Sequence, residues 1–194
     1  LVELLRHSDI QQLHVVIAAL KRHGSSVLDK IESLARLRPE LSEKDVSIIC
    51  NAVVTLAQMG RTDVLWKLLE ADSPPDVRVL LIHRLAPSGV TPEILAQKLT
   101  QQTSSSVRRS VLLALGEYEP FQTTSRFRES VAEHVAEIHE DDPDSGVHSA
   151  TDWLLREWMI GRDTHQQPSE IEDGKNWFVD QFGQTMLVVR GPVS

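Results

Sequence analysis

The chain has 194 residues, 41% of them hydrophobic, and a formal net charge of −8. This composition can form a buried core and excludes both a largely disordered chain and a membrane span of about eighteen apolar residues. The acidic balance also argues against DNA or RNA as the main partner, because phosphate binding requires a concentrated basic surface.

Apolar residues recur at helical spacing from about residue 10 to about residue 160 and predict a succession of helices. The predicted ranges are 10–23, 26–37, 44–54, 64–71, 75–85, 92–101, 105–115, 126–139 and 145–155. The stretches 73–76 and 142–144 offer cap oxygens and first-turn prolines to two of these helices. Three glycines lie where helices are expected to end, and they are Gly60, Gly89 and Gly116.

Four of the predicted helices resemble one another when they are aligned on Val46, Val77, Val107 and Val147. Each valine is followed at once by a polar or basic residue, and eight positions later by an apolar one. Eight residues is just over two helical turns, so these positions share one buried stripe. The aligned valines are 31, 30 and 40 residues apart, and a period of this length is typical of stacked helix pairs.

The opening Asp76-Val77-Arg78, with weaker echoes at Val107-Arg108 and at Val147, resembles the signature of HEAT-like repeats. The resemblance covers about residues 8–160. It implies an all-α fold, a right-handed α-solenoid of about five helix pairs over residues 1–160. It also implies that the aspartate caps the second helix of a repeat and that the arginine stacks on or pairs with the next repeat.

Few side chains form a pattern that suggests chemistry. Cys50 is the single cysteine and lies in an apolar run, which predicts a buried side chain. Metal-capable residues crowd 133–140 without the two histidines of a zinc-enzyme helix, which favours a solvated helix face. They are Glu133, His134, Glu137, His139 and Glu140. The run 141–146 lacks calcium-loop spacing and predicts a helix cap. We therefore predict no catalytic, cofactor-binding or metal-binding residue in this chain.

The helical histidines and tryptophans are interpreted as packing residues. His83 lies within a repeat helix and is expected to contact neighbouring helices rather than to act as a base. The same expectation applies to the tryptophans of the helical region, which are Trp66, Trp153 and Trp158.

The pattern changes after residue 160. Residues 161–175 are polar without apolar periodicity, as in a domain linker. Two strand-forming runs follow, 177–179 and 185–189, and the residues between them contain Gly183. The sequence therefore predicts a short C-terminal β-hairpin within residues 176–194.

This hairpin region resembles the opening of the formylglycine-generating-enzyme (sulfatase-modifying factor) domain. The matching residues are Trp177, Gly183, Gln184, Thr185, Met186, Gly191 and Pro192. The resemblance implies that residues 176–194 are the truncated start of such a domain in a large bacterial multidomain protein. Active members of the family use copper, and its paired cysteines and metal ligands lie downstream of this opening. No catalytic residue is therefore expected here.

We expect a non-catalytic interaction or scaffolding module that positions a following formylglycine-generating-enzyme-like domain. Its partner would be a protein or that adjacent domain, with no nucleic acid and no membrane span; a cytoplasmic compartment is favoured. Two alternatives stay open. One is that the function is the oxidoreductase activity of a longer parent protein, which an upstream serine/threonine kinase domain could accompany. The other is binding of a chromophore or of alkylated DNA, as some HEAT-like solenoids do, although the DNA version requires a basic groove.

Overall fold

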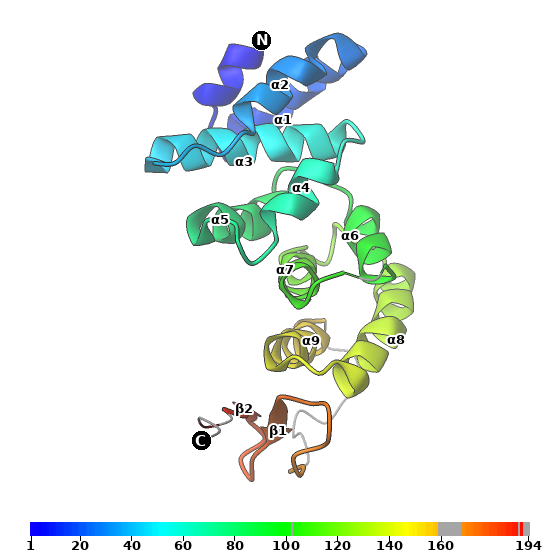
Figure 1. Ribbon diagram of the computed structural model, residues 1–194. Coiled ribbons are helices and arrows are strands. Elements are labelled where there is room, and N and C mark those ends of the chain that lie inside the picture. The colour runs from blue at the N-terminus through cyan, green and yellow to red at the C-terminus, as the bar shows by residue number, and fades with distance from the viewer. Residues whose placement is uncertain (102, 159–167, 190, 192–194) are drawn as a thin grey trace. The chain divides into compact units, whose positions relative to one another are not determined.

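The structure is a computed structural model that describes residues 1–101, 103–158, 168–189 and 191 (Figure 1). Its described part is helical up to Glu157 and ends in a two-stranded antiparallel sheet. The predicted all-α class with a short C-terminal β-hairpin is confirmed. The α-helices are α1 (Ile10–Lys21), α2 (Leu28–Leu34), α3 (Glu43–Gln58), α4 (Asp63–Leu68), α5 (Pro75–Leu85), α6 (Pro92–Leu99), α7 (Ser105–Gly116), α8 (Ser125–Asp141) and α9 (Ser145–Glu157). Two 3₁₀ helices, η1 (Val2–Arg6) and η2 (Gly24–Val27), and the strands β1 (Trp177–Val179) and β2 (Thr185–Leu187) complete the elements.

The chain divides into two compact units, Leu1–Tyr118 and Glu119–Ser194. In the first unit α3 is central, because it packs against η1, α2, α4 and α5 (Figure 1). Helix α5 also packs against α7, and α7 packs against α6. Helices α3, α5 and α7 therefore pack one against the next in chain order. A single right-handed solenoid over residues 1–160 stays a prediction.

Helix α3 shows how the local sequence sets its bounds. Ser42 caps it in a reciprocal capping box with Asp45, in which each side chain accepts the other residue's backbone N–H. Its middle is buried nearly all round, from Ile48 to Ala57. It ends before Gly60, which has a φ of 80° that side-chain-bearing residues avoid. A helix with no exposed middle face can serve as the core of the unit.

Helix α5 begins differently from the prediction. Pro75 is its first residue, as expected, but Pro74 occupies the N-cap position and has no side-chain oxygen to cap with. The Ser73 hydroxyl instead donates to the Lys67 carbonyl at 3.0 Å. The start of α5 therefore depends on the fixed φ of proline and on the missing N–H of Pro75 rather than on a side-chain cap.

The second unit consists of α8, α9 and the hairpin. A loop connects α7 to α8, and the Thr124 hydroxyl accepts the Phe127 N–H to cap α8. Helices α8 and α9 pack along each other, and β2 contacts α9. Phe127 and Trp158 meet between the two helices, with ring centroids 6.4 Å apart.

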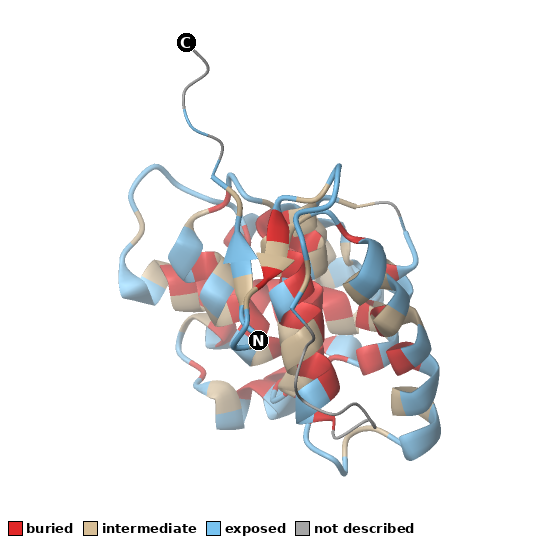
Figure 2. Cartoon of the chain, turned by 90° about the horizontal axis from the view of Figure 1, so that it is seen from below, coloured by how far each residue is buried: buried red, intermediate tan, exposed pale blue. Residues whose placement is uncertain are grey.

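Burial follows the amphipathic pattern in each unit, with buried residues on the inward helix faces and exposed ones outside (Figure 2). Tyr118 closes the first unit: its hydroxyl donates to the Val90 carbonyl at 2.7 Å, and burial raises its pKa. No helix in the described ranges is apolar enough over a sufficient length to cross a membrane.

Two predicted ranges change in detail. The segment predicted as one helix over 26–37 is a 3₁₀ turn followed by α2, which is only seven residues long. The second predicted strand, 185–189, keeps ladder geometry only to Leu187.

Candidate functional site: a hairpin held on helix α9

The N-terminus of α9 is capped from two places in the sequence. The Asp144 carboxylate accepts the N–H groups of Gly146 and Val147 at 2.9 and 3.0 Å. Asn176, immediately before β1, accepts the Ser145 N–H on its side-chain oxygen at 2.7 Å. The first three amide donors of α9, which have no partner within the helix, are thus satisfied. The hairpin completes a cap that the local sequence only begins.

Three aromatic rings stack between the hairpin and the helix pair. The ring of His148, on α9, lies between His139, at the end of α8, and Trp177, on β1. The centroid distances are 4.1 Å to His139 and 3.5 Å to Trp177, with interplanar angles of 20° and 16°. His148 and Trp177 are 2% and 6% exposed. The stack therefore buries aromatic area at the junction of all three elements.

Hydrogen bonds fix the orientation of both imidazoles. Nδ1 of His148 donates to the His139 carbonyl at 2.9 Å. Thr151 donates its hydroxyl proton to the His148 carbonyl at 2.7 Å, so its oxygen is available to accept from Nδ1 of His139 at 3.0 Å. Both histidines therefore hold a proton on Nδ1.

Trp177 is held at its edge and at both faces. Its Nε1 donates to the Asp142 carbonyl at 2.9 Å, and both groups are buried. His148 covers one face, and the Lys175 ammonium lies 4.7 Å from the ring centroid, which places it over the other face. The Asn176 N–H donates to the Pro143 carbonyl at 3.0 Å. The side chains and backbone of 175–177 thus fasten the hairpin to the α8–α9 turn.

The hairpin register determines which edge is paired. Trp177 lies opposite Leu187, Phe178 opposite Met186 and Val179 opposite Thr185. Val179 also exchanges hydrogen bonds with Ser169, whose N–H donates to the Val179 carbonyl at 3.0 Å and whose hydroxyl accepts the Val179 N–H at 2.9 Å. The outer edge of β1 is therefore occupied by the described end of the predicted linker. The earlier part of that linker, 161–167, lies outside the described residues.

The repeat-signature residues occupy equivalent positions. Val77, Val107 and Val147 are 0–1% exposed, as the aligned stripe predicts. The residue after each valine donates to a backbone carbonyl that precedes its helix in the sequence. Arg78 donates to the Glu70 carbonyl at 2.9 Å, Arg108 to the Thr103 carbonyl, and His148 to the His139 carbonyl. These side chains thus connect their helix to the segment before it. Contacts with the next repeat, which the resemblance implies, stay a prediction. Asp76 lies inside the first turn of α5 and does not cap it.

The residues of the second motif fall within or beside the hairpin. Trp177 begins β1, and Gly183 ends the turn with a φ of 75° that favours glycine. Thr185 and Met186 lie on β2, and Gly191 follows it as an exposed residue. Of this motif, Trp177 stacks on His148 of α9, and β2 also contacts α9.

Polar side-chain contacts link η1, α3, α5 and the end of α7 in the first unit. Asn51 donates to the carbonyls of Leu5 and Ser8 at 2.9 and 3.0 Å and accepts from Arg84. On the other side of α5, His83 contacts the Glu117 carboxylate at 3.0 Å, which confirms it as a contact residue between helices. Cys50 is buried as predicted, and burial raises the pKa of its thiol to about 12.

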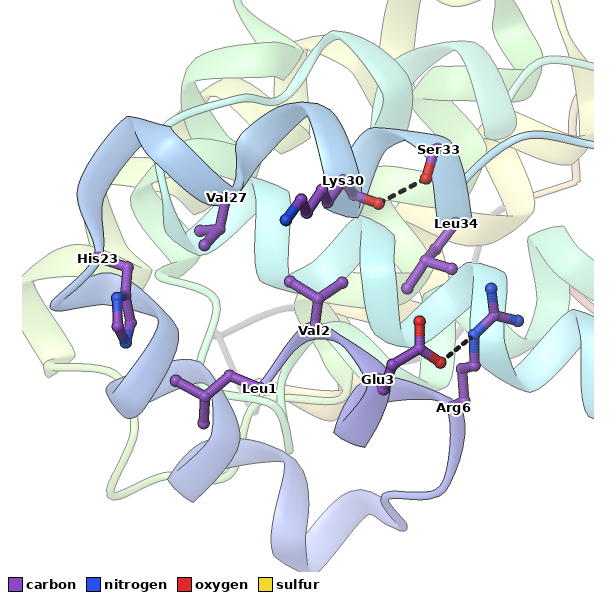
Figure 3. Close-up of a pocket in the computed structure, with 9 residues that line it drawn as sticks. All are labelled: Leu1, Val2, Glu3, Arg6, His23, Val27, Lys30, Ser33 and Leu34. Carbon is purple, nitrogen blue, oxygen red and sulfur yellow. Dashed lines mark hydrogen bonds and ion pairs between the residues drawn. The ribbon is translucent and has the colours of Figure 1, made fainter.

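The first unit also has a pocket of about 460 Å³ between η1, η2 and α2 (Figure 3). Its apolar lining comes from Leu1, Val2, Val27 and Leu34, and Lys30 and His23 also line it. The Arg6 guanidinium is paired with Glu3 at 2.8 Å (Figure 3). The polar groups that line this pocket form no arrangement of nucleophile, base and orienting residue.

The described residues contain no cluster of three or more metal-capable side chains. His134 contacts Glu137 at 3.2 Å on the surface, as predicted for a solvated face, whereas His139 belongs to the ring stack. Copper, which the family resemblance implies, favours thiolate ligands. The one thiol is fully buried and resists ionisation, so it is not suited to act as a copper ligand.

Sequence reasoning missed the stack and the second cap. In the sequence, His139 lies in the metal-capable run 133–140, and His148 follows the repeat valine Val147. Trp177 comes only after the linker. The one available signal was the departure from arginine at the fourth repeat position, where His148 stands.

Comparison with protein-family models, with characterised proteins and with solved structures found no match.

Proposed function

We propose that this chain is a non-catalytic helical-repeat module that holds a β-hairpin in a fixed orientation and presents it to a protein partner or an adjacent domain. The observation that supports the proposal is the attachment of the hairpin. A two-stranded ribbon is marginal alone in water, yet this one has a buried Trp177, a shared helix cap through Asn176 and a stack on His148.

The hydrogen bonds that attach the hairpin support a positioning role rather than a catalytic one. The hydrogen bonds at the contact join structural groups: carbonyls accept from Trp177 and Asn176, and the two imidazoles donate through Nδ1. Groups used in this way hold geometry and are not arranged around a space for a substrate. The adjacent domain would be the formylglycine-generating-enzyme-like one whose opening the hairpin resembles. Its orientation would then follow that of α9.

Positioning can be tested by a distance measurement on the whole chain. Spin labels at Ser149→Cys on α9 and Gln181→Cys in the hairpin turn, both exposed positions, are placed in a Cys50→Ala background. We expect a single narrow distance distribution. Trp177→Ala should broaden it, because the stack and the hydrogen bond to Asp142 are lost together.

The control is Phe182→Ala, which removes an aromatic ring from the same hairpin at a position that is 74% exposed. This variant should leave the distribution unchanged. A broad distribution in the unsubstituted chain, or a narrow one in Trp177→Ala, would contradict the proposal.

A further inference from the structure

We infer that the open edge of β2 is a docking site for an extended, basic polypeptide strand that adds to the hairpin as a third strand. The inference rests on the proposed function, since it names the kind of partner to which the hairpin is presented. Its observations are the hydrogen-bond register, the exposure of Leu187 and the charge of the second unit.

Among the described residues, no segment is hydrogen-bonded to the outer edge of β2. Asp180 donates to the Gln184 carbonyl and Val188 to the Asn176 carbonyl, so the pairs bonded between the strands are 180 with 184, 178 with 186 and 176 with 188. The backbone groups of Thr185 and Leu187 therefore point away from β1. The corresponding outer groups of Val179 on β1 are already bonded to Ser169.

The β2 edge lacks three of the features that protect edge strands, namely a charged side chain, a proline and a bulge. Natural edges are blunted by lysine, proline or bulges, and the run Thr185–Val189 has no charge and no proline. Its residue types are strand formers. The ladder has regular one-to-one pairing over the three registered pairs. Such an edge can accept a strand through main-chain hydrogen bonds.

Exposure of side chains points to the same edge. Leu187 lies opposite Trp177 and so shares its face of the sheet, yet it is 57% exposed whereas Trp177 is 6% exposed. Val189 is 81% exposed. The apolar surface on this face thus continues past the rings that cover Trp177. A strand beside β2 would place alternate side chains against Leu187 and Val189.

The acidic charge of the second unit indicates that the added strand is basic. Residues 119–194 contain 15 acidic and 6 basic side chains, while residues 1–118 contain 13 and 14. The net charge of −8 therefore comes from the unit that contains the hairpin. Two copies of this unit would repel each other, which disfavours pairing of β2 with itself. A strand flanked by lysine or arginine would be attracted.

The probe is a synthetic peptide, Lys-Thr-Val-Thr-Val-Thr-Lys, added to the whole chain. We expect saturable binding by fluorescence anisotropy and slower hydrogen exchange at the Thr185 and Leu187 amides. A peptide with glutamate in place of both lysines should bind at least tenfold more weakly. Raising the salt concentration should weaken binding of the basic peptide.

Leu187→Pro removes one outward N–H without removing a bond to β1, and should weaken binding at least tenfold. Leu187→Lys, which leaves the backbone free but adds charge and removes apolar contact, should also weaken it. The spin-label distance between 149 and 181 shows whether each variant keeps the hairpin in place. Met186→Pro, whose N–H is bonded to β1, provides the broken-hairpin reference.

Three outcomes would overturn the inference: no binding of the basic peptide while the spin-label distance stays narrow, equal binding by a docked Leu187→Pro, or a dimer of the chain that Leu187→Pro abolishes. All three leave the positioning function intact. A broad distance distribution in the unsubstituted chain would instead overturn the proposed function.

Discussion

His148 combines two tasks at the position that holds arginine in the two preceding repeats. Like Arg78 and Arg108 it donates to a backbone carbonyl that precedes its helix in the sequence. Its flat ring also provides a surface on which Trp177 stacks at 3.5 Å. One substitution in a repeat position thus changes an internal brace into a contact with the hairpin.

We predict that His148→Ala lowers the free energy of unfolding of the second unit by about 2–4 kcal/mol, since a buried hydrogen bond and two ring contacts are lost. Hydrogen exchange at α9 amides, measured at low denaturant, reports this value. The matched control is His83→Ala, whose side chain is 58% exposed in its contact with Glu117. It should cost less than about 1 kcal/mol. Equal costs for the two variants would show that the stack does not stabilise the unit.

Cys50 predicts a pH dependence with a definite sign. Burial raises the pKa of the folded-state thiol to about 12, partly opposed by Arg84, whereas an unfolded cysteine titrates near 8.5. Because the unfolded chain releases this proton first, stability is complete below about pH 8.5 and falls as the pH rises towards 12. From pH 8 to pH 10 the loss should be about 2 kcal/mol.

Urea unfolding of the unsubstituted chain and of Cys50→Ala at both pH values isolates this contribution. Tyr118, whose pKa burial also raises, is present in both proteins, so its contribution cancels in the comparison. The difference between the two proteins should therefore change by about 2 kcal/mol. A difference that does not change with pH would mean that the thiol is accessible to water.

At the scale of elements, the buried side chain of Asn51 connects α3 to its neighbours. Asn51 is 1% exposed, and its amide contacts η1 on one side and Arg84 of α5 on the other. Helical side chains lean towards the N-terminus, which is why Arg84, near the end of α5, reaches Ser47 and Asn51 on α3.

Asn51→Ala should therefore cost about 2–4 kcal/mol in the first unit, because two buried carbonyls lose their donor and Arg84 loses an acceptor. Ser47→Ala is the control: it removes a hydroxyl contact but keeps the Ser47 carbonyl, to which Arg84 donates at 3.1 Å. Its cost should be below about 1 kcal/mol. Chemical denaturation followed through Trp66, the tryptophan of the first unit, measures both.

The elements themselves could be predicted because their signals are local. The repeated valine stripe located α5, α7 and α9 within a residue or two, and Asp144 marked the start of α9. The cap of α5 could not be assigned in the same way, since a serine before two prolines can bond elsewhere, as Ser73 does. The strands were recognised from their residue types, and the position of Gly183 set the turn.

The contacts of the hairpin could not be predicted, because they join residues that are distant in the sequence. Asn176 reaches Ser145 and Trp177 reaches Asp142, more than thirty positions away in both cases. No period or spacing relates these pairs. The polar residues of the linker indicate that the helical pattern ends. They do not indicate that the strands pack against α9.

On the scale of the molecule, contacts divide the chain after Tyr118, and charge divides it at the same place. The first unit is nearly neutral, and the second has an excess of nine acidic side chains. Much of this excess lies on the exposed positions of α8, where Glu129, Glu133 and Glu137 follow one another at four-residue spacing. Like charges at this spacing destabilise a helix and are screened by salt.

Added salt should therefore stabilise the second unit more than the first. Between about 20 and 500 mM sodium chloride, where the screening length falls from above about 10 Å to below about 8 Å, we expect the opening free energy of α8 and α9 amides to rise by on the order of 1 kcal/mol. The amides of α3 and α5 should change by a few tenths at most. Hydrogen exchange at both concentrations measures the two units in one sample, with sodium chloride preferred over sulfate to avoid general stabilisation of folded chains. An equal rise in both units would mean that salt acts on burial in general, and that the acidic excess is already compensated where it lies.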